Sequence, residues 1–137
     1  MNLELGARPW WMNAVFAFCL FMTLLYLPYD LFWKPVASDA EVWFGLPLHG
    51  WAAKATEPLH WAIYAAGAFG FWKMRAWMHP WAALYTAQVA IGMLVWALTD
   101  ARTDGRGLAL GVPPFLAFGA LAWQLWRSRA HFNTRPG

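Results

Sequence analysis

Ionisable side chains interrupt the apolar stretch between positions 54 and 72. Lys54, Glu57 and His60 follow one another at intervals of three residues, so a helix would carry them as neighbours near one face. A carboxylic acid shielded from water holds its proton to a higher pH than one in water, and a nearby histidine or second carboxylate can receive that proton. We therefore predict acid–base chemistry here, with Glu57, Asp30 and His60 as the candidate catalytic residues.

Three apolar stretches each place polar and aromatic side chains along one helix face. At 100° per residue, these side chains span arcs of about 60° in the first stretch, about 120° in the second and about 80° in the third. An ionised side chain costs about 2.5–3.5 kcal/mol near the centre of a bilayer, so the three faces should turn toward one another. The pattern predicts a polar cavity that opens toward the non-cytoplasmic half. Its predicted ligand-binding residues are Trp61, Tyr64, Tyr85, Gln88 and Trp96.

A second interpretation leaves the same ionisable groups in water. Because a proline follows Glu57, Thr56 could cap a helix that begins there, with Lys54 and Glu57 among the lipid headgroups. Only about 16 residues would then remain to cross the membrane, which is short. Asp30 could equally lie at a solvated helix end, and a single His60 is more often a hydrogen-bonded core residue than a ligand.

The composition determines which elements can position these groups. Of 137 residues, 61% are hydrophobic and 12% are charged, and the chain contains 12 tryptophans. Apolar stretches of about 20 residues cross a ~30 Å hydrocarbon core as helices, and Trp and Tyr gather at their ends. We predict an all-α membrane protein with a single domain, an antiparallel bundle of four transmembrane helices. The spans are expected at about 10–33, 50–72, 81–99 and 108–126.

The distribution of charge predicts the orientation of these spans. Basic residues are more numerous on the side that holds both termini, which is typical of the cytoplasmic side, and acids gather on the other side. We expect the inner membrane of a bacterium, with both termini in the cytoplasm. The net charge of +3 fits this topology, so we expect no nucleic-acid partner. The loop at 34–50 contains an amphipathic segment and is expected to lie on the membrane surface.

The sequence lacks the motifs of common cofactors and nucleophiles. It contains no P-loop, no dinucleotide fingerprint, no serine elbow and no haem-attachment motif. His49, Glu57 and His60 do not reproduce the spacing of metal-binding pairs on two helices. The single Cys19 lies within the first span and is expected to be a buried, inert thiol. We therefore expect no metal and no cofactor.

Four motifs recur in one known family. They are "LPYD" with Asp30, "PLHGWAAKATE" with Glu57, a basic turn that leads into Pro80, Tyr85 and Gln88, and the final "PPFLAFGALAWQLWRS". In their order and spacing, over most of its length, the chain resembles the EXPERA superfamily, the emopamil-binding and sigma-two-receptor-like membrane proteins.

The resemblance implies a bundle of four or five helices around a cavity that fits a lipid or sterol. Acids near the first two helices and an aromatic wall would engage a cationic amine or a carbocation-like intermediate. In the isomerases of that family, a histidine and an acid one turn apart shuttle a proton across a ring double bond. Here Ala53 lies one turn before Glu57 and His60 follows it. This difference from the family's spacing of histidine and acid weakens the expectation of catalysis more than that of ligand binding.

Two functions of different kinds follow. The first is binding of a hydrophobic sterol- or isoprenoid-like ligand in an intramembrane cavity, with isomerisation of a double bond by acid–base proton shuttling as its enzymatic form. The alternative is a non-enzymatic accessory subunit of a larger membrane complex, in contact with a protein partner or with a second copy of the chain. An enclosed pocket lined by Asp30, Glu57 and Tyr85 would favour the first. A proton or solute pathway through Asp30, Glu57 and His60 is the least supported function.

Overall fold

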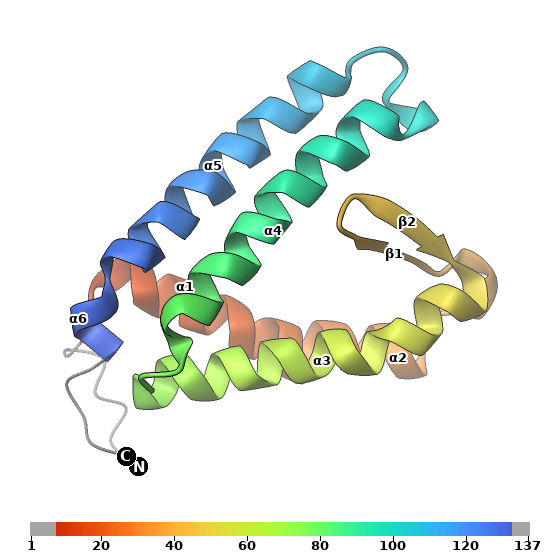
Figure 1. Ribbon diagram of the computed structural model, residues 1–137. Helices are drawn as coiled ribbons and strands as arrows, with labels where there is room; N and C mark the ends of the chain where they lie inside the picture. Colours follow the sequence, from red (N-terminus) through yellow and green to blue (C-terminus); the bar gives the residue numbers. More distant parts are fainter. Residues whose placement is uncertain (1–7, 133–137) are drawn as a thin grey trace.

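The computed structural model describes residues 8–132, which are mostly helical (Figure 1). The first rod consists of α1, a π-helical segment η2 and α2, and the other long helices are α3, α4 and α5. Their bounds are α1 Trp10–Phe21, η2 Met22–Tyr26, α2 Leu27–Phe32, α3 Gly50–Lys73, α4 Met78–Thr99 and α5 Gly107–Arg127. The short elements are η3 Val36–Ser38, β1 Ala40–Trp43, β2 Leu46–His49, η4 Ala101–Thr103 and α6 Arg129–Phe132.

Within residues 8–132, three helical segments are long and apolar enough to cross a membrane, which indicates a membrane protein. They are Trp10–Phe32, Met78–Thr99 and Gly107–Arg127, close to the predicted spans at 10–33, 81–99 and 108–126. The predicted span at 50–72 corresponds to α3, which has 24 residues. Helix α3 is less apolar than the other three because its first half contains Lys54, Glu57 and His60.

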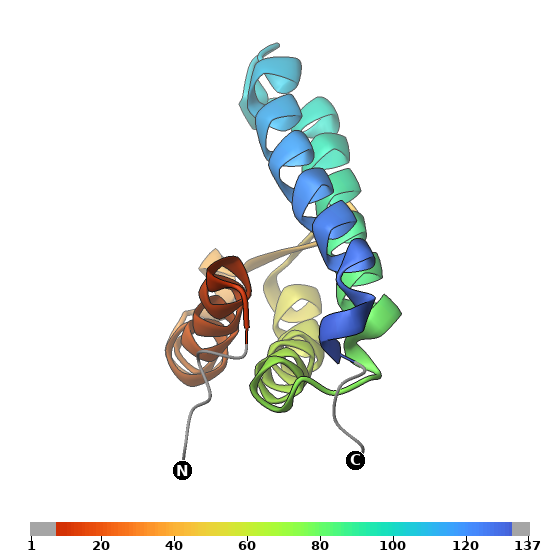
Figure 2. The same cartoon turned by 90° about the vertical axis from the view of Figure 1, so that its left-hand side faces the viewer.

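The long helices pack as two pairs. Helix α4 lies beside α5, and the rod of α1 and α2 lies beside α3; the pairs meet near the α3–α4 turn and diverge toward the other end (Figures 1 and 2). Where they meet, buried side chains from both pairs form the core, including Met12, Phe16, Phe71, Met78 and Leu125. The helices of the predicted bundle therefore pack together at one end only, and α3 and α4 diverge toward the other end (Figure 1).

Glycines allow α4 and α5 to approach closely. A Cβ added at Gly107 would meet the main-chain oxygen of Ala97, and one added at Gly111 would lie 2.7 Å from the Ala97 Cβ. Small residues at such positions let helix backbones pack tightly within membranes.

We expect Gly107→Ala to lower the free energy of unfolding by about 1–3 kcal/mol, because the new methyl group displaces backbone that cannot rotate away. Gly119→Ala is the matched control on the same helix, since a Cβ there has no neighbour within 4 Å. Titration with SDS in mixed micelles measures both variants. Equal losses at the two positions would contradict this explanation of α4–α5 packing.

A β-hairpin occupies the wide end between the two helix pairs (Figure 1). Strands β1 and β2 pair antiparallel with Trp43 opposite Leu46, and the turn residues Phe44 and Gly45 have φ of 53° and 85°. The Trp43 indole N–H donates to Thr56 Oγ1 in α3 at 3.0 Å. On the other side, the Gly45 nitrogen lies 3.2 Å from where a Cβ of Gly92 would be. The segment expected to lie along the membrane surface is thus a hairpin held between α3 and α4.

Helix α3 begins earlier than the water-exposed interpretation required. The helix starts at Gly50 and continues through Pro58. Thr56 is inside it and donates from Oγ1 to the Ala53 carbonyl at 2.8 Å. The interpretation of Thr56 as the N-cap of this helix was therefore wrong. Glu57 lies fully buried, with 0% of its surface exposed.

Candidate functional site

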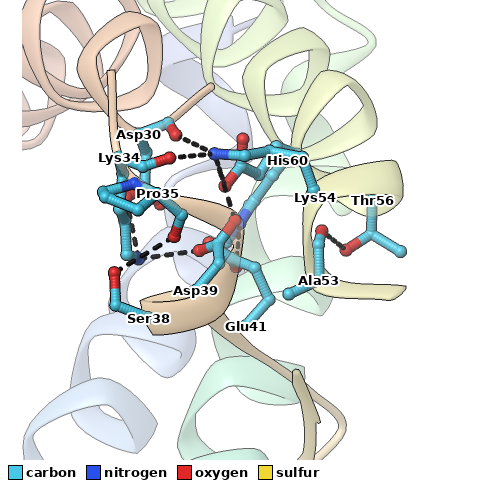
Figure 3. A network of polar contacts seen from close by, with 11 residues as sticks. Asp30, Lys34, Pro35, Ser38, Asp39, Glu41, Ala53, Lys54, Thr56 and His60 are labelled. Carbon is cyan, nitrogen blue, oxygen red and sulfur yellow. Dashed lines mark hydrogen bonds and ion pairs between the residues drawn. The ribbon is translucent and has the colours of Figure 1, made fainter. Parts of the chain in front are cut away.

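Four acidic side chains from three parts of the chain lie together at the wide end of the molecule. They are Asp30 in α2, Asp39 before β1, Glu41 in β1 and Glu57 in α3, and all four are buried. We call them the acidic cluster, of which Figure 3 labels Asp30, Asp39 and Glu41. One carboxylate oxygen from each of Asp30, Glu41 and Glu57 lies within 4.8 Å of the other two. The structure therefore brings Asp30 and Glu57, two of the predicted site residues, to the same place.

Two lysines neutralise part of this charge. Lys34 Nζ lies 2.8 Å from Asp30 Oδ1 and 2.8 Å from Asp39 Oδ1. Lys54 Nζ lies 3.2 Å from Asp39 Oδ2 and 3.4 Å from Glu57 Oε1. Burial opposes ionisation of Asp39, but contacts with the Lys34 ammonium group, the Glu57 carboxyl group and the Lys54 ammonium group outweigh it and lower the pKa of Asp39 to about 2. Burial likewise opposes the charge on Lys34, whose pKa its two carboxylate partners nevertheless raise.

Lys54 also joins α3 to the end of α2. Its ammonium group donates to the main-chain oxygen of Asp30, and to that of Lys34 at 3.1 Å. Carbonyls at a helix C-terminus lack intrahelical partners and carry partial negative charge, which a lysine can satisfy. A single side chain therefore holds together α2, the loop before β1 and α3.

His60 connects the acidic cluster to α4. Its Nδ1 lies 2.9 Å from Glu41 Oε2, and its Nε2 lies 3.2 Å from the Tyr85 hydroxyl oxygen. Because an ionised carboxylate only accepts hydrogen bonds, Nδ1 carries the proton in the neutral ring, and Nε2 accepts from the Tyr85 O–H. Glu41, His60 and Tyr85 form a chain along which a proton can move from the acids toward the middle of α4.

Aromatic rings surround this chain. The ring centroids of Trp43 and His60 lie 5.0 Å apart, those of His60 and Tyr64 lie 5.3 Å apart, and those of Tyr64 and Tyr85 lie 6.1 Å apart. All four side chains are half-buried. We call Trp43, His60, Tyr64 and Tyr85 the ring cluster. It brings together three of the residues predicted from the sequence.

The remaining predicted residues lie apart from these contacts or make other ones. The Trp61 indole N–H donates to the main-chain oxygen of Thr23 at 2.8 Å, and Thr23 belongs to the π-helical segment η2. Trp96 lies 11 residues beyond Tyr85 on α4, about 16 Å along the helix. The Arg102 guanidinium is 5.9 Å from its ring. Gln88 is half-buried, one turn after Tyr85.

Two open hollows in the described part of the chain lie away from the acidic cluster. One of about 340 Å³ is bordered by the α4–α5 connection, including Asp100 and Thr103. The other, of about 400 Å³, lies between that connection and β2, next to Pro47 and His49. Neither is lined by Asp30, Glu57 or Tyr85.

Sequence reasoning missed Lys34, Asp39 and Glu41. Asp39 and Glu41 are two residues apart, a spacing that places both side chains on one face of a strand. Treating the loop as a hairpin would have pointed both acids toward the same neighbours. The ion pairs of Lys34 leave no local trace beyond its position four residues after Asp30.

The known proteins offer no independent evidence on this site. Comparisons of the chain with models of protein families, with curated proteins and with solved structures gave no match.

Proposed function

We propose that this protein crosses the membrane four times, with α3 as the fourth span, and binds a hydrophobic ligand between α3 and α4. With both termini in the cytoplasm, the acidic cluster and the hairpin lie at the outer ends of the helices. The ligand is a sterol- or isoprenoid-like molecule with a large apolar body and one polar end. The observation that carries the proposal is the half-buried ring cluster, with an imidazole and two phenols on helices that diverge.

The chemistry of the ring cluster supports a ligand of this shape. Polar side chains at membrane depth usually find a partner, because an unpaired polar group in hydrocarbon is costly. The Tyr85 O–H donates to His60 Nε2, and its oxygen keeps a lone pair that can accept from a ligand hydroxyl or ammonium group. The faces of Trp43 and Tyr64 offer apolar contact and, for an amine, attraction to the ring quadrupole.

The same site supports ligand binding more strongly than turnover. Glu57 and Asp30 each contact a lysine ammonium group, at 3.4 Å and 2.8 Å. An adjacent ammonium group favours the ionised carboxylate, whereas burial favours the protonated one, so these contacts alone do not make either acid a proton donor to an alkene. If a double bond is isomerised here, His60 and Tyr85 are the better placed pair, because their hydrogen-bond chain reaches the ring cluster.

A retained molecule is the direct test. We expect native mass spectrometry and lipid extraction of the purified protein to find one sterol- or isoprenoid-like molecule per chain. Tyr85→Phe should lower its occupancy at least about fivefold, because the hydroxyl that accepts from the ligand is gone. Tyr29→Phe is the control, since Tyr29 is 58% exposed on α2. Absence of any enriched lipid, or equal occupancy in both variants, would reject the proposal.

The alternative, an accessory subunit of a larger membrane complex, is favoured by a separate observation. Val42, Phe44 and Leu46 on the hairpin are 41%, 67% and 63% exposed. Such apolar side chains can contact a neighbouring membrane protein. If a photo-crosslinker placed at Phe44 labels one protein in stoichiometric yield in intact membranes, and no lipid is retained, the accessory role is the correct one.

A further inference from the structure

The acidic cluster has more carboxyl groups than lysine partners. Asp30, Asp39, Glu41 and Glu57 are 2%, 2%, 7% and 0% exposed. Lys34 and Lys54 supply two positive charges to these four groups. When all four carboxyl groups are ionised, two negative charges are left without an ammonium partner. Uncompensated buried charge costs several kcal/mol, so the ionised cluster favours binding of a positively charged species.

Four buried carboxylate oxygens in the cluster accept no hydrogen bond. The two of Asp39 lie beside lysine ammonium groups, whereas Asp30 Oδ2 and Glu57 Oε2 lack such a contact. Lys34 and Lys54 contact the other oxygen of each group, Oδ1 and Oε1. Buried carboxylate oxygens in proteins are nearly always paired, so these two indicate a missing partner.

The spacing of the acids fits a hard metal ion. Oxygen atoms from Asp30, Glu41 and Glu57 lie within 4.8 Å of one another. Calcium binds oxygen at 2.3–2.6 Å, so two oxygens on one ion lie no more than about 5 Å apart. We propose that Asp30, Glu41 and Glu57 bind one divalent cation of the Ca²⁺, Mg²⁺ or Mn²⁺ class at the outer end of the helices.

The neighbours of the three acids suit this role. A divalent ion cancels the two remaining negative charges. His60 donates to Glu41 at 2.9 Å, the kind of contact that orients a metal-binding carboxylate. The donor set contains only oxygen, which favours Ca²⁺, Mg²⁺ or Mn²⁺ over Zn²⁺ or Cu²⁺. The ion would fasten β1 to α2 and α3, and this role does not depend on whether the protein binds a hydrophobic ligand.

Manganese provides a direct measurement. Protein in detergent is stripped with a chelator and titrated with Mn²⁺ at neutral pH while electron paramagnetic resonance reports the free ion. We expect one saturable site per chain from which Ca²⁺ displaces Mn²⁺. Glu57→Gln and Asp30→Asn should each weaken the site at least about tenfold, because each removes a charged ligand. Asp104→Asn is the control, since Asp104 is exposed on the α4–α5 turn.

Terbium luminescence tests the location of the site without changing a ligand. Tb³⁺ replaces Ca²⁺ and is excited by a nearby indole, and the Trp43 ring is 5.0 Å from the His60 ring. Trp43→Phe should reduce the emission, whereas Trp123→Phe, at an exposed position on α5, should not. This measurement decides the question if either ligand variant fails to fold.

Three results would overturn the proposal. The first is absence of saturable binding below about 1 mM, the weak limit of extracellular calcium modules. The second is a site that survives Glu57→Gln unchanged, which would indicate acids elsewhere. The third is a cluster that takes up two protons in place of the metal, each shared between neighbouring carboxylates. Retention or loss of a lipid would not alter any of these results, so this test is separate from that of the proposed function.

Discussion

Replacing Lys54 with methionine is expected to lower the free energy of unfolding by about 3–5 kcal/mol, the range measured when one partner of a buried ion pair is removed. The change leaves Asp39 and Glu57 without an ammonium group that now lies 3.2 Å and 3.4 Å away. It also removes the donor to the main-chain oxygens of Asp30 and Lys34. Methionine has a similar length, so packing changes little. SDS titration in mixed micelles measures the loss.

A second change separates charge from packing. If uncompensated charge causes the loss, Glu57→Gln in the Lys54→Met protein should recover at least about 1.5 kcal/mol, because it removes one of the stranded charges. Lys73→Met is the control on the same helix, where the residue is exposed and the ammonium group lies 4.2 Å from the centroid of the Trp72 ring. Losses that simply add in the double variant would show that the lysine acts through its hydrophobic stem.

Positions of helices were largely predictable from the sequence. In a membrane, runs of about 20 apolar residues bounded by Trp and Tyr form helices, because every backbone polar group must be paired within the segment. The span expected at 108–126 therefore differs from α5, Gly107–Arg127, by one residue at each end. The convergence of Asp30 and Glu57 followed from the same physics, since costly polar groups in adjacent helices turn toward one another.

The arrangement of the hairpin could not be predicted in this way. Its strands have four residues each, and its turn contains Phe44 and Gly45, not the Asn-Gly pair typical of tight hairpins. Its place is determined by contacts across the chain, the Trp43 indole on Thr56 and Gly45 on α4, which no local pattern encodes. For the same reason Glu41 was not recognised as the partner of His60. Whether the EXPERA resemblance reflects function stays a prediction, which the retained-lipid experiment addresses.

The position of Glu41 depends on how closely the hairpin turn approaches α4, and Gly45→Ala should disrupt that approach. A Cβ on Gly45 would lie 2.5 Å from the Val95 Cβ and 3.0 Å from the Gly92 carbonyl oxygen. The residue also has φ of +85°, where side chains are strained. The strain costs about 1–2 kcal/mol and the overlap about 1–3 kcal/mol more. We expect the sum to appear as lost stability in SDS titration.

Gly105→Ala separates these two contributions. Gly105 has φ of +75°, but a Cβ there would meet nothing within 4 Å, so this variant carries the backbone strain alone. We expect Gly45→Ala to lose at least about 1 kcal/mol more than Gly105→Ala. Because Glu41 lies four residues before Gly45, moving the hairpin away from α4 should also lengthen its 2.9 Å contact with His60. Only Gly45→Ala should therefore weaken Mn²⁺ binding, and equal stability and Mn²⁺ affinity in the two variants would mean that the turn does not position the site.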